Sequence, residues 1–172
     1  MVDVALCDLL PLVPATLASA SMPPRAGRAV EVPSTWDFLE RIAISNMFDI
    51  ESSRLALSRT MADGIKVYAD RMIVDRIRAA TSFTRAAADA GLESPDYHLD
   101  LRHQALLDSL RREADGAAFD TACIRSQRES QGEIVALCEA YAKDGENARI
   151  RRFAHDFLPV LRNHLDLASH LG

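Results

Sequence analysis

Apolar residues near the carboxyl end of the chain recur at alternating intervals of four and three, and this pattern constrains the fold most. The series consists of Ile150, Ala154, Phe157, Leu161, His164, Ala168 and Leu171. This spacing places the side chains on one face of an α-helix. A face that repeats every seven residues packs against other helices at shallow crossing angles. We therefore predict a helix over residues 146–170 that forms one side of a helical bundle.

Other segments show the same helical period, and none shows the two-residue period of a strand. The further predicted helices cover 34–60, 64–90, 101–113 and 117–143. Together they predict an all-α fold: a four-helix bundle with a short extra helix between the second and third long helices. The sequence leaves open whether this short helix caps the bundle end or belongs to a crossover connection.

Capping residues support two of these boundaries. Ser34, followed three residues later by Asp37, is typical of a capping box and predicts the start of the first helix. Gly91 followed by Leu92 predicts a left-handed, Schellman-type end of the second long helix, with Leu92 as its hydrophobic contact.

The size and composition indicate one folded domain preceded by a separate segment. The 172 residues are 48% hydrophobic and 26% charged, which is ordinary for a soluble globular protein. The net charge of -5 argues against a nucleic-acid partner, because phosphates require a basic surface. We assign residues 34–172 to the bundle domain and residues 1–33 to an apolar segment and linker.

The apolar segment has two interpretations. The run "LLPLVPATLASA" at 9–20 ends in small residues that resemble a signal-peptidase site, which indicates export to the periplasm. The residues before the run include two aspartates and no Lys or Arg, which indicates a cytoplasmic tail instead. The run is too short, and too interrupted by proline, to span a membrane as a helix. We favour export.

The three cysteines, Cys7, Cys123 and Cys138, cannot all be paired because their number is odd. Cys123 and Cys138 lie 15 residues apart on one predicted helix. At about 1.5 Å per residue they are roughly 22 Å apart, beyond the reach of a disulfide. Both are interpreted as small buried side chains.

Each of the four long helices carries polar residues near the middle of its apolar stripe. The set consists of Glu51, Arg76 with Asp75 beside it, Gln127, Gln131 and His164. Because each lies about halfway along its helix, these side chains are expected to meet at one level of the bundle. A buried charge without a partner is costly, so we predict that Glu51 pairs with Arg76.

Four of these residues also have a structural interpretation. Glu51 and Gln131 could lie at the boundary of the bundle, and Arg76 could extend along its aliphatic stem to solvent. His164 could be a hydrogen-bonded core histidine rather than a ligand.

Several motifs resemble a known protein family. They are "FLERIAISNMFDIESSRLAL", "VYADRMIVDRIRA", "HQALLDSLRREADGAAFDTACI" and "RRFAHDFLPVLRNHLDLA", in this order, over about residues 35–171. The chain thereby resembles domain-of-unknown-function family 4142, whose members are bacterial, usually exported and sometimes labelled putative membrane or outer-membrane proteins. The resemblance implies a ferritin-like helical bundle, with no established activity.

The resemblance also implies which residues occupy the characteristic positions of the family. Its glutamate in the first helix corresponds to Glu51, and its Asp-His pair in the second corresponds to Asp75 and Arg76. A histidine of the third long helix corresponds to Gln131, while that of the fourth is retained as His164. Two of three characteristic histidines are therefore replaced in this chain.

These replacements bear on metal binding. A ferritin-like di-iron site requires Glu from two helices and Glu-x-x-His from two others, and no Glu-x-x-His occurs in this chain. We predict no metal and no cofactor; Glu51, Asp75 and His164 are the candidate ligands if a metal does bind. The sequence contains no nucleophile constellation and no glycine-rich phosphate loop, so we assign no catalytic residue.

Three functions are compatible with these observations. The one we favour is a non-catalytic, exported or envelope-associated bundle whose polar core cluster replaces a ligand site. The alternatives are a metal-binding or redox bundle with an incomplete ligand set, and a cytoplasmic interaction module. Bundles often form homodimers, but no apolar stripe is visibly left over for that purpose, and the protein partner stays open.

Overall fold

The structure is a computed structural model that describes residues 32–171. The predicted export signal and Cys7 lie outside the described residues, as does all but the end of the predicted segment 1–33.

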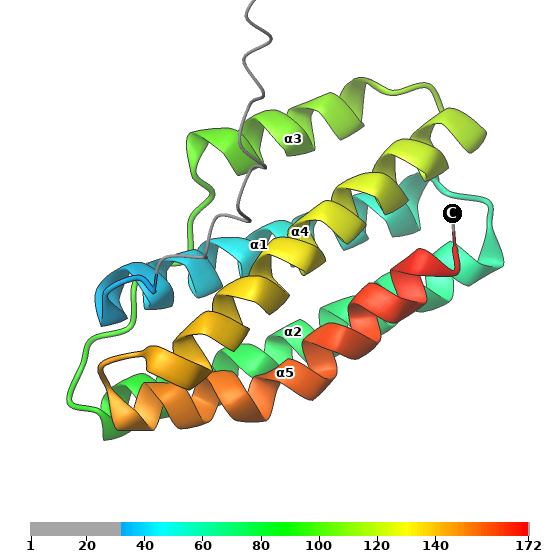
Figure 1. The fold of residues 1–172 in the computed structure, drawn as a ribbon. Helices are drawn as coiled ribbons and strands as arrows, with labels where there is room; N and C mark the ends of the chain where they lie inside the picture. Colours follow the sequence, from blue (N-terminus) through cyan, green and yellow to red (C-terminus); the bar gives the residue numbers. More distant parts are fainter. Residues whose placement is uncertain (1–31, 172) are drawn as a thin grey trace, which may run out of the picture.

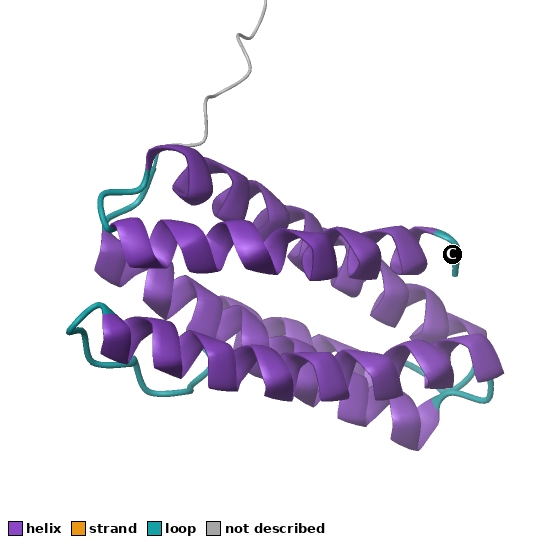
Figure 2. Cartoon of the chain, turned by 90° about the horizontal axis from the view of Figure 1, so that it is seen from below, coloured by secondary structure: helices purple, strands orange, loops and turns teal. Residues whose placement is uncertain are grey.

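Five α-helices make up the described part, and no strand occurs among residues 32–171. The helices are α1 (Thr35–Arg59), α2 (Asp63–Asp89), α3 (Leu101–Arg112), α4 (Ala117–Asp144) and α5 (Ala148–Ser169). The prediction of an all-α fold is confirmed (Figure 2). Each predicted boundary lies within two residues of the observed one.

The two capping predictions are also confirmed. The Ser34 hydroxyl accepts a hydrogen bond from the Asp37 amide at 3.2 Å and caps α1. At the end of α2, Gly91 adopts a φ of 72°, which a residue with a Cβ atom adopts only with strain. The Leu92 amide then donates to the Ala87 carbonyl at 2.9 Å, the bond that defines a Schellman end.

The four long helices lie side by side (Figure 1). α1 and α2 form one antiparallel pair, and α4 and α5 form a second pair (Figure 1). α2 also packs against α5, and α1 against α4. The connection 90–116 runs back along the length of these helices, so α4 points in the same direction as α2 (Figure 1). Helix α3 lies within this crossover and packs against α1 and α4.

The buried apolar side chains form two clusters at opposite ends of the long helices. One includes Phe38, Phe83, Tyr141 and Ile150. The other includes Ala56, Met72, Phe119 and Ala168. The middle of each long helix lies between the two clusters, and the buried polar side chains are concentrated there.

Candidate functional site

The inward face of α1 is polar in its middle. The residues Phe38, Ile42, Ser45, Asp49, Ser52 and Ala56 are all buried and recur at alternating spacings of four and three. The apolar members at either end belong to the two core clusters. The three polar members face the centre of the helix packing and form the α1 part of a polar layer.

An ion pair between α1 and α2 lies at the centre of this layer. Arg76 Nη2 is 2.6 Å from Asp49 Oδ2, and the two side chains are 1% and 0% exposed. Gln131 on α4 contacts both partners: its Nε2 donates to Asp49 Oδ2 at 3.0 Å, and its Oε1 accepts from Arg76 Nη2 at 2.9 Å. One charge-assisted network therefore joins three of the four long helices.

The two charges of this pair stabilise each other. Burial raises the pKa of the Asp49 carboxyl, while the Arg76 guanidinium opposes the rise. Arginine stays protonated in proteins, and a buried guanidinium requires a counter-charge, so we treat Asp49 as ionised. The Arg76 guanidinium also lies 5.4 Å from the ring centre of Phe157 on α5, a cation–π distance. The Nε atom of Arg76 has no hydrogen-bond partner within residues 32–171.

A second hydrogen-bonded group lies next to the ion pair. Gln127 Nε2 donates to Ser52 Oγ at 2.6 Å, and the Tyr68 hydroxyl donates to Gln127 Oε1 at 3.3 Å. The Ser52 hydroxyl donates in turn to the Phe48 carbonyl at 2.6 Å. The polar layer thus continues across α1, α2 and α4 with hydrogen bonds between uncharged groups.

His164 on α5 pairs with Asp75 on α2 rather than with the central network. Its Nε2 lies 3.0 Å from Asp75 Oδ2, while its buried Nδ1 has no hydrogen-bond partner in the described part. Burial lowers the pKa of His164, against the opposing effect of the Asp75 carboxylate. Partial burial raises the pKa of Asp75, but His164 and Arg71 outweigh it, so the net shift of that pKa is downward.

The predicted ion pair between Glu51 and Arg76 is wrong. Glu51 lies at the surface of α1, 27% exposed, and pairs with Arg54 one turn away at 2.7 Å. Asp49, which was missed, pairs with Arg76. Glu51 shares an apolar stripe with Ile44, Phe48 and Leu55, and this stripe lies beside the inward face rather than on it. The spacing from Phe38 and Ile42 onward to Ala56 would have identified Asp49.

The structure brings four of the six predicted polar residues into the buried layer: Arg76, Gln127, Gln131 and His164. Asp75 lies at the edge of the layer, with a side chain 21% exposed. Besides Asp49, sequence reasoning missed Ser45, Ser52 and Asn46, whose Nδ2 donates to the Arg76 carbonyl at 3.2 Å.

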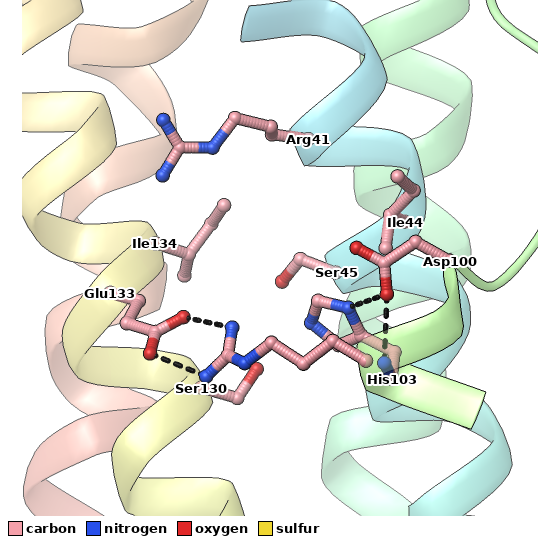
Figure 3. Close-up of a pocket in the computed structure, with 9 residues that line it drawn as sticks. Arg41, Ile44, Ser45, Asp100, His103, Ser130, Glu133 and Ile134 are labelled. Carbon is pink, nitrogen blue, oxygen red and sulfur yellow. Dashed lines mark hydrogen bonds and ion pairs between the residues drawn. The ribbon is translucent and has the colours of Figure 1, made fainter. Parts of the chain in front are cut away.

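A small pocket opens beside the polar layer, between α1, α4 and the start of α3 (Figure 3). Its volume is about 110 Å³. Its polar lining consists of Arg41, Ser45, Asp100, Arg102, His103, Ser130 and Glu133, and its apolar lining of Ile44 and Ile134. Ser45 and Ser130 belong to both the polar layer and the pocket, because their hydroxyls also donate to Asp49 at 3.5 Å and 3.4 Å.

Two hydrogen-bonded side-chain pairs lie at the rim of this pocket (Figure 3). Arg102 on α3 binds both oxygens of Glu133 on α4, at 2.7 Å and 2.6 Å. His103 Nδ1 lies 2.6 Å from Asp100 Oδ1, and the same oxygen accepts from the His103 amide at 2.7 Å. Asp100 is therefore both the cap of α3 and the residue that orients the His103 ring.

The family model described as "Domain of unknown function (DUF4142)" matches residues 20–171. The chain belongs to the DUF4142 family. The resemblance inferred from the motifs is therefore confirmed. The comparisons with curated proteins and with solved structures found no match.

The polar layer of this DUF4142 protein does not fit a metal ion between the helices. Within residues 32–171, no group of three or more His, Cys, Asp or Glu side chains could hold a metal ion. The central carboxylate, Asp49, is bound by Arg76, whose fixed charge would repel a cation. Of the candidate ligands, Asp75 and His164 contact each other, whereas Glu51 pairs with Arg54.

No helix within residues 32–171 combines the length and the hydropathy needed to cross a bilayer.

Proposed function

We propose that this protein is a non-catalytic helical-bundle protein whose polar core is a structural ion-pair network in place of a ligand site. The observation that carries the proposal is the Asp49–Arg76 pair with its Gln131 partner, buried at the centre of the layer. The guanidinium supplies within the chain the positive charge that a metal ion would otherwise supply to that carboxylate.

The architecture we propose is a ferritin-like four-helix bundle formed by residues 34–172. Two antiparallel helix pairs joined by one long crossover support this interpretation, because that connectivity is found in ferritin-like folds.

We also propose that the bundle is exported, with residues 1–33 as the leading segment. Only the sequence supports this proposal. Mass spectrometry of the mature amino terminus tests this: a start near Ser21 supports export, and an intact Met1 overturns it.

Elemental analysis tests the proposed structural role of the core. The protein should be purified without a metal-chelating tag, and iron, zinc and manganese should be measured per chain. We expect substoichiometric amounts of all three. The Arg76→His variant should also lack tightly bound metal, because Gln131 still occupies the neighbouring position. Stoichiometric metal in the unmodified protein would overturn the proposal in favour of a metal-binding or redox function.

A further inference from the structure

We propose that the pocket between α1, α3 and α4 binds a small carboxylate that carries a neighbouring hydrogen-bond donor, of the 2-hydroxy or 2-amino acid type. The inference concerns a different site from the buried ion pair, although the two share Ser45 and Ser130.

The inner wall of the pocket accepts hydrogen bonds. Ser45 and Ser130 are 5% and 7% exposed, and both hydroxyls contact Asp49. An ionised carboxylate is only an acceptor, so the serine hydroxyls are the donors in these contacts of 3.5 Å and 3.4 Å. Each serine oxygen then keeps lone pairs that can face the pocket. A ligand group that reaches these oxygens therefore has to donate, as a hydroxyl or an ammonium group does.

The outer part of the pocket offers one uncommitted positive charge. Both oxygens of Glu133 are bound by Arg102, and Asp100 is bound by His103. Arg41 is exposed and extends along the upper edge of the pocket in Figure 3. No salt bridge joins it to another residue of the described part. Its guanidinium presents a planar set of donors that matches a carboxylate. The pocket thus combines an acceptor wall with a carboxylate-binding side chain.

The size of the pocket limits the ligand to a few atoms. A cavity of about 150 Å³ accommodates benzene, which has six heavy atoms. At about 110 Å³, this pocket fits a molecule of similar or smaller size, such as lactate or alanine. The side chains of Ile44 and Ile134 provide an apolar wall for the methyl group of such a ligand.

A titration of the full chain, followed by two-dimensional NMR of backbone amides, tests the proposal. The probes are L-lactate, L-alanine, propionate and ethanolamine. We expect saturable shifts of amides around Ser45, His103 and Ser130 with lactate, with alanine or with both, which also identifies the donor that the pocket prefers. Propionate lacks the donor and ethanolamine lacks the carboxylate, so each should bind about tenfold more weakly or worse.

Substitutions locate the site. Arg41→Gln should weaken lactate or alanine binding about tenfold, whereas Arg54→Gln on the same helix should leave it unchanged. Ser130→Ala should reduce the preference of the pocket for lactate or alanine over propionate. If that variant does not fold, Ser45→Ala provides the same comparison. The proposal is overturned if neither lactate nor alanine shifts these amides, if propionate binds equally well, or if Arg41→Gln binds normally. None of these outcomes depends on the metal content of the protein.

Discussion

The guanidinium of Arg76 lies 2.6 Å from the carboxylate of Asp49, at a point where neither side chain contacts solvent. Removing one partner leaves the other charge buried and uncompensated. We expect Asp49→Ala to lower the free energy of unfolding by about 3–5 kcal/mol, as for other broken buried pairs. Urea denaturation followed by circular dichroism measures this change.

Two comparison variants separate the ion pair from simple loss of packing. The double variant Asp49→Leu, Arg76→Met removes both charges and should recover part of the lost stability; the remainder reflects the Gln131 amide, which loses both of its partners. Glu51→Ala removes a surface pair with Arg54 and should change stability by less than about 1 kcal/mol. A loss in Glu51→Ala as large as that in Asp49→Ala would contradict the assignment of Asp49 as the core carboxylate.

Stability should fall when the solution is acidified, partly because of His164. Burial lowers its pKa in the folded state, whereas the unfolded chain titrates near about 6.5. Below that pH the unfolded state binds a proton that the folded state does not, so the free energy of unfolding decreases by up to about 1.4 kcal/mol per pH unit. The free energy of unfolding continues to decrease until the pH falls to the pKa of His164 in the folded state.

The variant His164→Gln isolates this contribution, because glutamine can still donate to Asp75 but does not titrate. Unfolding curves between pH 7 and pH 5 should be less pH-dependent in the variant than in the unmodified protein. The lowered pKa of Asp75 acts in the same direction at more acidic pH, and the raised pKa of Asp49 acts in the opposite direction. Equal pH dependence in both proteins would show that His164 does not contribute.

Helix α3 should depend on Arg59 for its attachment. The Arg59 guanidinium donates to the Leu110 carbonyl at 2.8 Å and to the Glu113 carbonyl, both at the carboxyl end of α3, and it stacks on Phe119. Arg59→Met removes these hydrogen bonds and should cost about 1–3 kcal/mol. Hydrogen exchange of residues 101–112 should accelerate in this variant, whereas the exposed Arg112→Met should leave it unchanged.

Cys123 and Cys138 should be unreactive in the folded protein. Both thiols are free and buried, and burial raises the pKa of each to about 12. Thiolates are the reactive form, so a disulfide reagent should label neither residue until the protein unfolds. The measurement uses Cys7→Ser, which leaves only these two thiols, with and without denaturant. Rapid labelling under native conditions would contradict the prediction.

The helices could be predicted because their signals are local. Ser34, Gly91 and the seven-residue spacing each act over one or two turns, and the observed helix ends lie close to those predicted from them. The path of the connection 90–116 could not be predicted, because it depends on contacts of α3 with α1 and α4 that lie far apart in the sequence.

The candidate site was predicted only in part, for a physical reason. Apolar periodicity identifies the inward face of a helix where that face is apolar, as it is around Arg76 and His164. On α1 the middle of the inward face is itself polar, so apolar periodicity indicates the neighbouring stripe, which contains Glu51 instead of Asp49. The pocket was missed because Arg41, His103 and Ser130 come from three separate helices.

The polar layer also limits how the long helices can align with one another. Apolar seams tolerate a shift of one helix along its neighbour by a full seven-residue repeat, because one apolar contact replaces another. Such a shift of α2 against α1 would move Arg76 about 10 Å away from Asp49 and leave both charges buried without a partner. The pair therefore excludes the shifted alignments and leaves the chain with a single register.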